Sequence, residues 1–148
     1  MVAIQRLLAC ALSMAAVAMP VRADELGRYN IADVMAQPGA KERLDRNIRL
    51  YFAYQGTPVI AQNLGEARYT RRTNRGSTAA KGPCPWAFLG GLLALQGKAR
   101  ERGGNAVVNI VALHDGKQTA PPGQYDCEFG LWMVSIEVQG DIVKLEGQ

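Results

Sequence analysis

Disulfide formation by two cysteines, Cys84 and Cys127, is the chemistry that can be predicted most directly from the sequence. The third cysteine, Cys10, lies in an apolar N-terminal segment that we expect to be removed during export. An even pair of cysteines in an exported chain indicates a disulfide bond, because exported proteins enter an oxidising compartment. Closing a loop of about 43 residues stabilises a fold by about 4 kcal/mol in the chain-entropy model. We therefore predict a Cys84–Cys127 disulfide, with a free or metal-binding pair as the alternative.

His114 is the only histidine of the chain, so a Ser-His-Asp or Cys-His catalytic arrangement would have to use it. Its candidate partners are Ser77, Ser135 and Asp115. His114 directly precedes Asp115 and Gly116, and this position is typical of a solvated turn residue. We therefore predict no catalytic residue, and a small hydrolase that uses His114 is the alternative.

Asp126 and Glu128 flank Cys127 and share one face of a predicted strand, where two carboxylates could work as an acid and a base. Such a pair needs burial to separate the two pKa values, so we predict a solvated strand face instead. The sequence contains no C-x-x-C, no H-x-x-x-H and no acidic loop with calcium-site spacing. We therefore predict neither a metal site nor a cofactor.

A basic segment without acidic residues lies between Ala67 and Lys81. Basic groups beside an aromatic side chain are able to contact nucleic acid, anionic lipid or an acidic protein face. Because we expect export, we predict no nucleic-acid partner. One interpretation is a solvated edge strand and surface loop whose arginines prevent edge pairing, and the other is a patch that binds an unknown envelope protein. The candidate partner-binding residues are Arg68, Tyr69, Arg71, Arg72, Arg75 and Lys81.

The chain has 148 residues, a formal net charge of +4 and an apolar fraction of 48%. These values fit one ordinary domain plus a removable segment, and they exclude a multidomain machine and a disordered protein. Residues 1–23 are predicted to be a signal peptide, because Arg6 precedes a short apolar run and Ala23 suits a cleavage site. Cys10 lies inside that run rather than after it, which disfavours a lipoprotein, and lipidation of Cys10 is the alternative. We find no transmembrane segment in the remaining sequence.

One amphipathic helix is predicted over about residues 84–102. Its apolar side chains, Trp86 among them, recur at helical spacing after Pro85, and Gly103 follows as a helix stop. The stretch before the first strand, residues 24–46, is predicted to be a loosely ordered lead-in.

Alternating or continuous apolar patterns predict strands elsewhere. Residues 105–113 form an almost continuous apolar run, typical of a strand covered on both faces. The apolar parity shifts near Gly130, which predicts a bulge or break and assigns Trp132 to the core. Gly140 and Asp141 are predicted to turn the chain. The predicted strands span residues 47–55, 66–73, 105–113, 125–138 and 142–145.

These elements predict the α+β class, with one main amphipathic helix packed on a small mixed or antiparallel sheet. The domain is expected to span residues 47–148. It follows the signal peptide and the lead-in.

Four segments resemble a known family: residues 84–89 (CPWAFL), 103–110 (GGNAVVNI), 125–130 (YDCEFG) and 140–145 (GDIVKL). They resemble small secreted bacterial proteins that are often labelled "excinuclease ATPase subunit". More distantly, the order of cysteine, helix, G-G-N-A-V strand and cysteine-bearing strand resembles the periplasmic domain of the Rcs envelope-stress sensor lipoprotein RcsF and the YbjQ-type domains. The resemblance implies an α+β domain with a helix on a small sheet. The Rcs sensor has two disulfides and a lipid anchor, whereas this chain is expected to form one disulfide and to carry no lipid.

The excinuclease label does not fit the residues, because the chain has no phosphate-binding G-x-x-x-x-G-K-[ST] loop. We therefore expect a non-enzymatic protein of the periplasm or the secreted space, a binding or stress-related accessory module of the envelope. The alternatives are an inhibitor or immunity-type protein that blocks a secreted enzyme, and the small hydrolase that uses His114.

Overall fold

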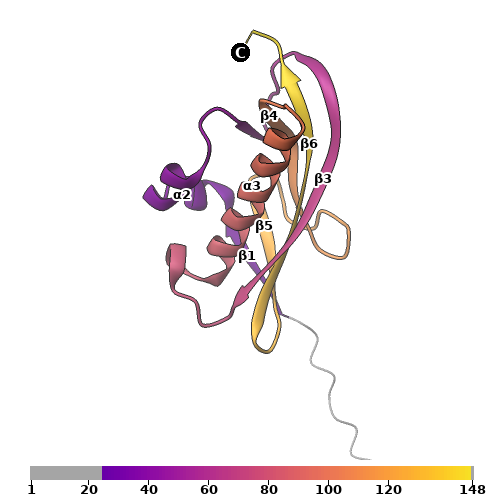
Figure 1. The fold of residues 1–148 in the computed structure, drawn as a ribbon. Coiled ribbons are helices and arrows are strands. Elements are labelled where there is room, and N and C mark those ends of the chain that lie inside the picture. Colours follow the sequence, from indigo (N-terminus) through magenta and orange to yellow (C-terminus); the bar gives the residue numbers. More distant parts are fainter. Residues whose placement is uncertain (1–24, 148) are drawn as a thin grey trace, which may run out of the picture.

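The computed structural model describes residues 25–147, so the predicted signal peptide and Cys10 lie outside the described residues. Six strands form one mixed sheet, and the long helix lies across one of its faces (Figure 1). The elements are β1 (Glu25–Asn30), α1 (Ile31–Met35), α2 (Pro38–Arg43), β2 (Arg49–Phe52), β3 (Ile60–Asn74), η1 (Ala79–Lys81), α3 (Pro83–Glu101), β4 (Ala106–Leu113), β5 (Gln124–Phe129) and β6 (Met133–Leu145).

Strand β6 is the centre of the sheet. On one side it pairs antiparallel with β3 along almost its whole length, and on the other side with β5 at its start and with β4 further along. Strand β2 adds to β4 in parallel, and β1 adds to β5 antiparallel. The predicted α+β class with one main helix is confirmed, and the sheet is its dominant part.

Helix α3 spans Pro83–Glu101, which confirms the helix predicted over about residues 84–102. Proline is accepted in the first turn because an amide there has no partner within the helix. The buried side chains of α3 include Phe88, Leu92 and Leu95, which pack on the sheet. A Cβ built at Gly91 would lie 2.6 Å from Val138 Cγ2, so the helix backbone approaches β6 closely at this residue.

A disulfide joins Cys84, in the first turn of α3, to Cys127 on β5, with the two Cα atoms 6.0 Å apart. Both residues are completely buried. The bridge therefore fastens the start of the helix to the sheet across the core, and the predicted cysteine pair is confirmed.

The first described residues differ from the loosely ordered lead-in predicted for 24–46. They form β1, α1 and α2, and Ile31, Val34 and Ala40 are buried. The physical reason is long-range pairing, because β1 gains its backbone hydrogen bonds from β5 near the other end of the chain. A single-sequence pattern contains no sign of such a partner.

The strand predicted over 47–55 is shorter: β2 spans Arg49–Phe52, and the Ala53 amide adds one more hydrogen bond to β4, to the Ile110 carbonyl at 3.0 Å. It ends in a turn in which the Gln55 amide donates to the Phe52 carbonyl over 2.8 Å. Tyr54, beyond the end of this strand, is 47% exposed. The polar strand predicted over 66–73 lies within the longer β3, which occupies an edge of the sheet as expected. The apolar strand predicted over 105–113 is β4, which lies between β6 and β2 and has buried side chains on both faces.

The predicted break near Gly130 is the turn of a hairpin, in which the Gly130 amide donates to the Met133 carbonyl over 2.9 Å. The turn predicted at Gly140 is wrong, because β6 continues through this residue. A Cβ at Gly140 would lie 2.6 Å from Val107 Cγ1, so the glycine leaves room for the Val107 side chain of the neighbouring strand β4.

Candidate functional site

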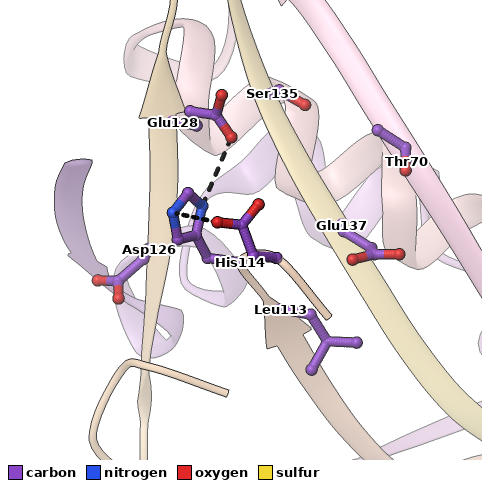
Figure 2. A pocket seen from close by; sticks show the side chains of 8 residues that line it. Thr70, Leu113, His114, Asp126, Glu128, Ser135 and Glu137 are labelled. Atoms are coloured by element: carbon purple, nitrogen blue, oxygen red, sulfur yellow. Dashed lines mark ion pairs between the residues drawn. The ribbon is translucent and has the colours of Figure 1, made fainter. Parts of the chain in front are cut away.

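A polar cavity of about 170 Å³ lies where β4, β5 and β6 approach each other (Figure 2). Its lining side chains alternate along the strands with those that face α3, so the cavity is on the opposite face of the sheet. The end of β4 supplies a histidine, and alternate positions of β5, β6 and β3 supply carboxylates and hydroxyls. The lining residues are Thr70, Leu113, His114, Asp115, Asp126, Glu128, Ser135 and Glu137.

The His114 imidazole lies between two carboxylates. Its Nδ1 is 3.5 Å from Glu128 Oε2 and its Nε2 is 3.5 Å from Asp115 Oδ2 (Figure 2). Among residues 25–147, no hydrogen bond joins the imidazole to Ser135, and Ser77 lies in the loop after β3, outside this cavity. A serine nucleophile needs its base within hydrogen-bond reach. The geometry therefore brings His114 to carboxylates rather than to a hydroxyl nucleophile.

Asp126 belongs to an ion pair that crosses from β5 to β1. Its Oδ1 accepts a hydrogen bond from Arg28 Nε at 2.8 Å, and its Oδ2 accepts one from the Thr119 hydroxyl at 2.6 Å. The Arg28 hydrogen bond lowers the pKa of Asp126 from its usual value, partial burial opposes this effect, and the Thr119 hydrogen bond adds to it. Asp126 is therefore held as an anion, which does not suit it to act as a proton donor.

No metal or cofactor site was predicted from the sequence. Over the described part of the chain, no group of three or more histidine, cysteine, aspartate or glutamate side chains is placed so that it could hold a metal ion. In the same residues, no helix has both the length and the apolar character needed to cross a membrane.

The basic segment predicted from the sequence does not form one patch, because strand alternation sends its members to two faces. Arg68 and Arg72 lie on the face of the cavity, and Arg68 Nη1 is 3.4 Å from Glu137 Oε1. Arg71 and Tyr69 lie on the α3 side, where Arg71 Nε donates to the Gly90 carbonyl at 3.3 Å.

The last two members of this segment, Arg75 and Lys81, lie beyond β3. Arg75 supports the β5–β6 turn: its amide donates to the Trp132 carbonyl at 3.0 Å, and its Nη1 donates to the Gly130 carbonyl at 2.9 Å. Its guanidinium carbon is 5.3 Å from the centre of the Phe129 ring. Lys81 ends η1, and Gly82 separates it from α3.

The turn between β5 and β6 carries an apolar tip that the sequence analysis missed, which we define as Leu131, Trp132 and Met133. Leu131 is 72% exposed, Trp132 76% and Met133 42%. The assignment of Trp132 to the core is wrong, because the parity shift at Gly130 marks a reversal of the chain and not an irregularity within one strand. The glycine followed by the shift was the available signal for a hairpin. Trp86, which was predicted to lie on the apolar stripe of the helix, is partly buried and packs against the core.

No family model matches this chain, and no curated protein matches it. One solved structure with some similarity is the crystal structure of a protein of unknown function of the DUF74 family from Pediococcus pentosaceus. It is 10% identical, with a TM-score of 0.45, and the alignment covers 66% of this chain and 98% of the other. A likeness of this size carries no argument about fold or function.

Proposed function

We propose that this protein is an exported, non-catalytic binding module of the bacterial envelope, and that it docks onto a partner protein through its apolar tip. The observation that carries the proposal is the exposure of three consecutive large apolar side chains at Leu131, Trp132 and Met133. Exposed apolar groups gathered at one place mark interaction sites, whereas single ones need no explanation.

The tip is held in place before any partner arrives. Arg75 forms hydrogen bonds to carbonyls on both sides of Leu131 and lies over Phe129. A fixed turn loses little conformational freedom when it binds, which favours affinity. Tryptophan and arginine are also the residue types that most often dominate the energy of protein interfaces. We infer a partner with an apolar pocket and an acidic rim, the latter facing Arg75.

The decisive experiment places a photoreactive amino acid at Trp132, and in a control at Val59, in the chain expressed in its host. Val59 is 67% exposed and lies near the opposite end of β6, where its carbonyl accepts from the Glu146 amide. We expect one protein to crosslink from position 132 and not from position 59. If that protein is a secreted enzyme whose activity this chain blocks, the module is of the inhibitor type.

The partner identified in this way is then purified, and its affinity is measured for the unchanged chain, Trp132→Ala and Val59→Ala. We expect Trp132→Ala to weaken binding about thirtyfold, as for an interface hot spot, and Val59→Ala to have no effect. Equal affinity of all three chains contradicts the proposal. The proposal is also contradicted if no protein crosslinks and the chain binds vesicles of anionic phospholipid through its tip. In that case the apolar tip binds a membrane surface rather than a protein.

Export is the second part of the proposal. It is supported by the residues that suggest a signal peptide and is compatible with the buried Cys84–Cys127 disulfide. Mass spectrometry of the natural product should find a chain that starts at Asp24 or within a few residues of it, without an acyl group. A lipidated terminus at Cys10 would contradict the proposed processing.

A small hydrolase is the second candidate, because His114 and Ser135 line one cavity, although no hydrogen bond joins them among the described residues. The variant His114→Ala separates the two functions. If the protein is a docking module, the His114→Ala variant should bind the partner as tightly as the unchanged chain. If it is a hydrolase, the variant should lose its activity while its folding is unchanged.

A further inference from the structure

A second cavity, of about 510 Å³, lies at the N-terminal end of α3, on the side of the sheet covered by the helices. Its size is typical of a site for a small organic ligand. Its walls come from five elements: β1, α1, η1, the first turn of α3 and β5. The residues that matter for its chemistry are Arg28, Tyr29, Val34, Lys81, Pro85 and Tyr125.

Tyr125 gives this cavity an unusual polar group. The residue is completely buried, and its ring centre lies 4.1 Å from that of Phe88 and 5.6 Å from that of Tyr29. Its hydroxyl has no hydrogen-bond partner within residues 25–147. Burial raises the pKa of Tyr125, so the phenol keeps its proton and can donate it in a hydrogen bond. Tyr125 is one of the residues that line the cavity, and its buried hydroxyl is a donor without an acceptor, a role that a ligand oxygen can fill.

The lining holds two cationic side chains, Arg28 and Lys81, and one carboxylate, Asp33. Lys81 lines the cavity and forms no ion pair with any other described residue. Its backbone has a φ of 63°, a conformation that residues other than glycine rarely adopt. The Arg28 guanidinium is engaged by Asp126. The carboxylate of Asp33 also lines the cavity and accepts a hydrogen bond from Asn30 at 3.1 Å. Lys81 is therefore the cation available to a ligand.

The remaining wall is apolar and aromatic. Tyr29, Val34 and Pro85 offer flat or aliphatic surface between the two polar groups. A planar ring can pack there against Tyr29, because aromatic pairs favour stacked or edge-on contacts.

We propose that this cavity binds a small aromatic carboxylate that carries a second oxygen, with the carboxylate facing Lys81 and the second oxygen accepting the Tyr125 hydroxyl. This ligand site does not depend on the apolar tip. The proposed function can therefore fail while this inference holds, and the reverse is equally true.

Three probes of nearly the same shape separate the two polar contacts. Para-hydroxybenzoate has both groups, benzoate lacks the second oxygen, and para-hydroxybenzyl alcohol lacks the charge. Binding to the folded domain is followed by NMR chemical-shift mapping and calorimetry. We expect para-hydroxybenzoate to bind tightest, with dissociation constants of about 1 mM or below, and the largest shifts to fall around Tyr29 and Pro85.

Two variants then test the assigned contacts. Lys81→Gln should weaken both carboxylates about threefold and leave para-hydroxybenzyl alcohol unchanged. Tyr125→Phe should weaken para-hydroxybenzoate about tenfold and leave benzoate unchanged, since the ring that stacks on Phe88 remains. Lys144→Gln is the matched control, because this exposed lysine lies at the far end of β6.

The proposal is overturned if none of the probes binds saturably, if the shifts map to another surface, or if Lys81→Gln and Lys144→Gln weaken binding equally. Thermal unfolding of each variant checks that it is folded. A loss of all three probes in Tyr125→Phe with an intact fold also contradicts the assignment, because that result would mean that the hydroxyl supports the cavity rather than the ligand.

Discussion

Asp126 is held by partners from two distant parts of the chain, the Arg28 guanidinium of β1 and the Thr119 hydroxyl of the loop before β5. Its carboxylate accepts three hydrogen bonds from these two groups. The ion pair thereby joins the first strand of the domain to β5 through side chains as well as through the backbone. Its contribution depends on the charge of Asp126 and therefore on pH.

We predict that the cost of Asp126→Asn depends on pH. The lowered pKa of Asp126 in the folded protein means that the unfolded chain takes up a proton more readily. The stabilisation is thus fully present above the ordinary carboxyl pKa of about 4 and is lost as the pH falls through the folded-state value. Urea unfolding should show a constant difference in free energy between about pH 5 and 7, and a shrinking one below about pH 4.

Glu146→Gln serves as the control for this series, since Glu146 is exposed and makes no ion pair with another described residue. Its free energy of unfolding should follow that of the unchanged chain. An Asp126→Asn difference that stays the same down to pH 2 would show that the carboxylate charge does not stabilise the fold.

At the scale of elements, two glycines of α3, Gly91 and Gly97, differ in how closely their surroundings approach them. Gly91 faces the sheet, where an added Cβ would lie 2.6 Å from Val138 Cγ2. Gly97 has nothing within 4 Å of its Cβ position. The first glycine sets the distance between helix and strand, and the second is free to become alanine.

We predict opposite effects for the two alanine substitutions. Gly97→Ala should raise the free energy of unfolding by up to about 1 kcal/mol, because alanine favours the helix. Gly91→Ala should lower it by about 1–3 kcal/mol, because the core has no room for the methyl group. Chemical denaturation measures both. The double variant Gly91→Ala, Val138→Ala should be less destabilised than the sum of its parts, and simple additivity would argue against the close contact.

Local patterns predicted α3 and β4 well, because a helical stripe and an apolar run are both contained in one stretch of sequence. Local patterns failed where the conformation of a residue depends on a contact with a residue far away in the sequence. Gly140 was assigned to a turn because its contact with Val107 cannot be inferred from neighbouring residues. The cysteine pair was predictable, whereas the apolar tip and the Tyr125 cavity were not, since exposure and an unpaired hydroxyl are properties of the assembled fold.

At the scale of the whole molecule, the Cys84–Cys127 disulfide joins the helix to the sheet. Cys84 is next to Pro85 and Cys127 is two positions from Tyr125, so the bridge also holds together two walls of the second cavity. Both the stability of the fold and the shape of this cavity therefore depend on one covalent link.

We predict that reduction lowers the free energy of unfolding by about 4 kcal/mol and the melting temperature by about 10 °C or more. Calorimetry with and without dithiothreitol measures the change. The double variant Cys84→Ala, Cys127→Ala should have the stability of the reduced protein, and dithiothreitol should not change its melting temperature. Two titratable thiols in the native protein would show that the bridge does not form.

The central place of β6 also decides how much of the chain must be present before the sheet can form. Strand β6 is made last, yet β3, β4 and β5 all pair with it, and Arg28 is separated from Asp126 by 98 positions. A growing chain has no common partner for its strands until residues 133–145 have been added. The sheet therefore forms only when β6 is present, and the contacts between distant segments make its formation a slow, non-local step.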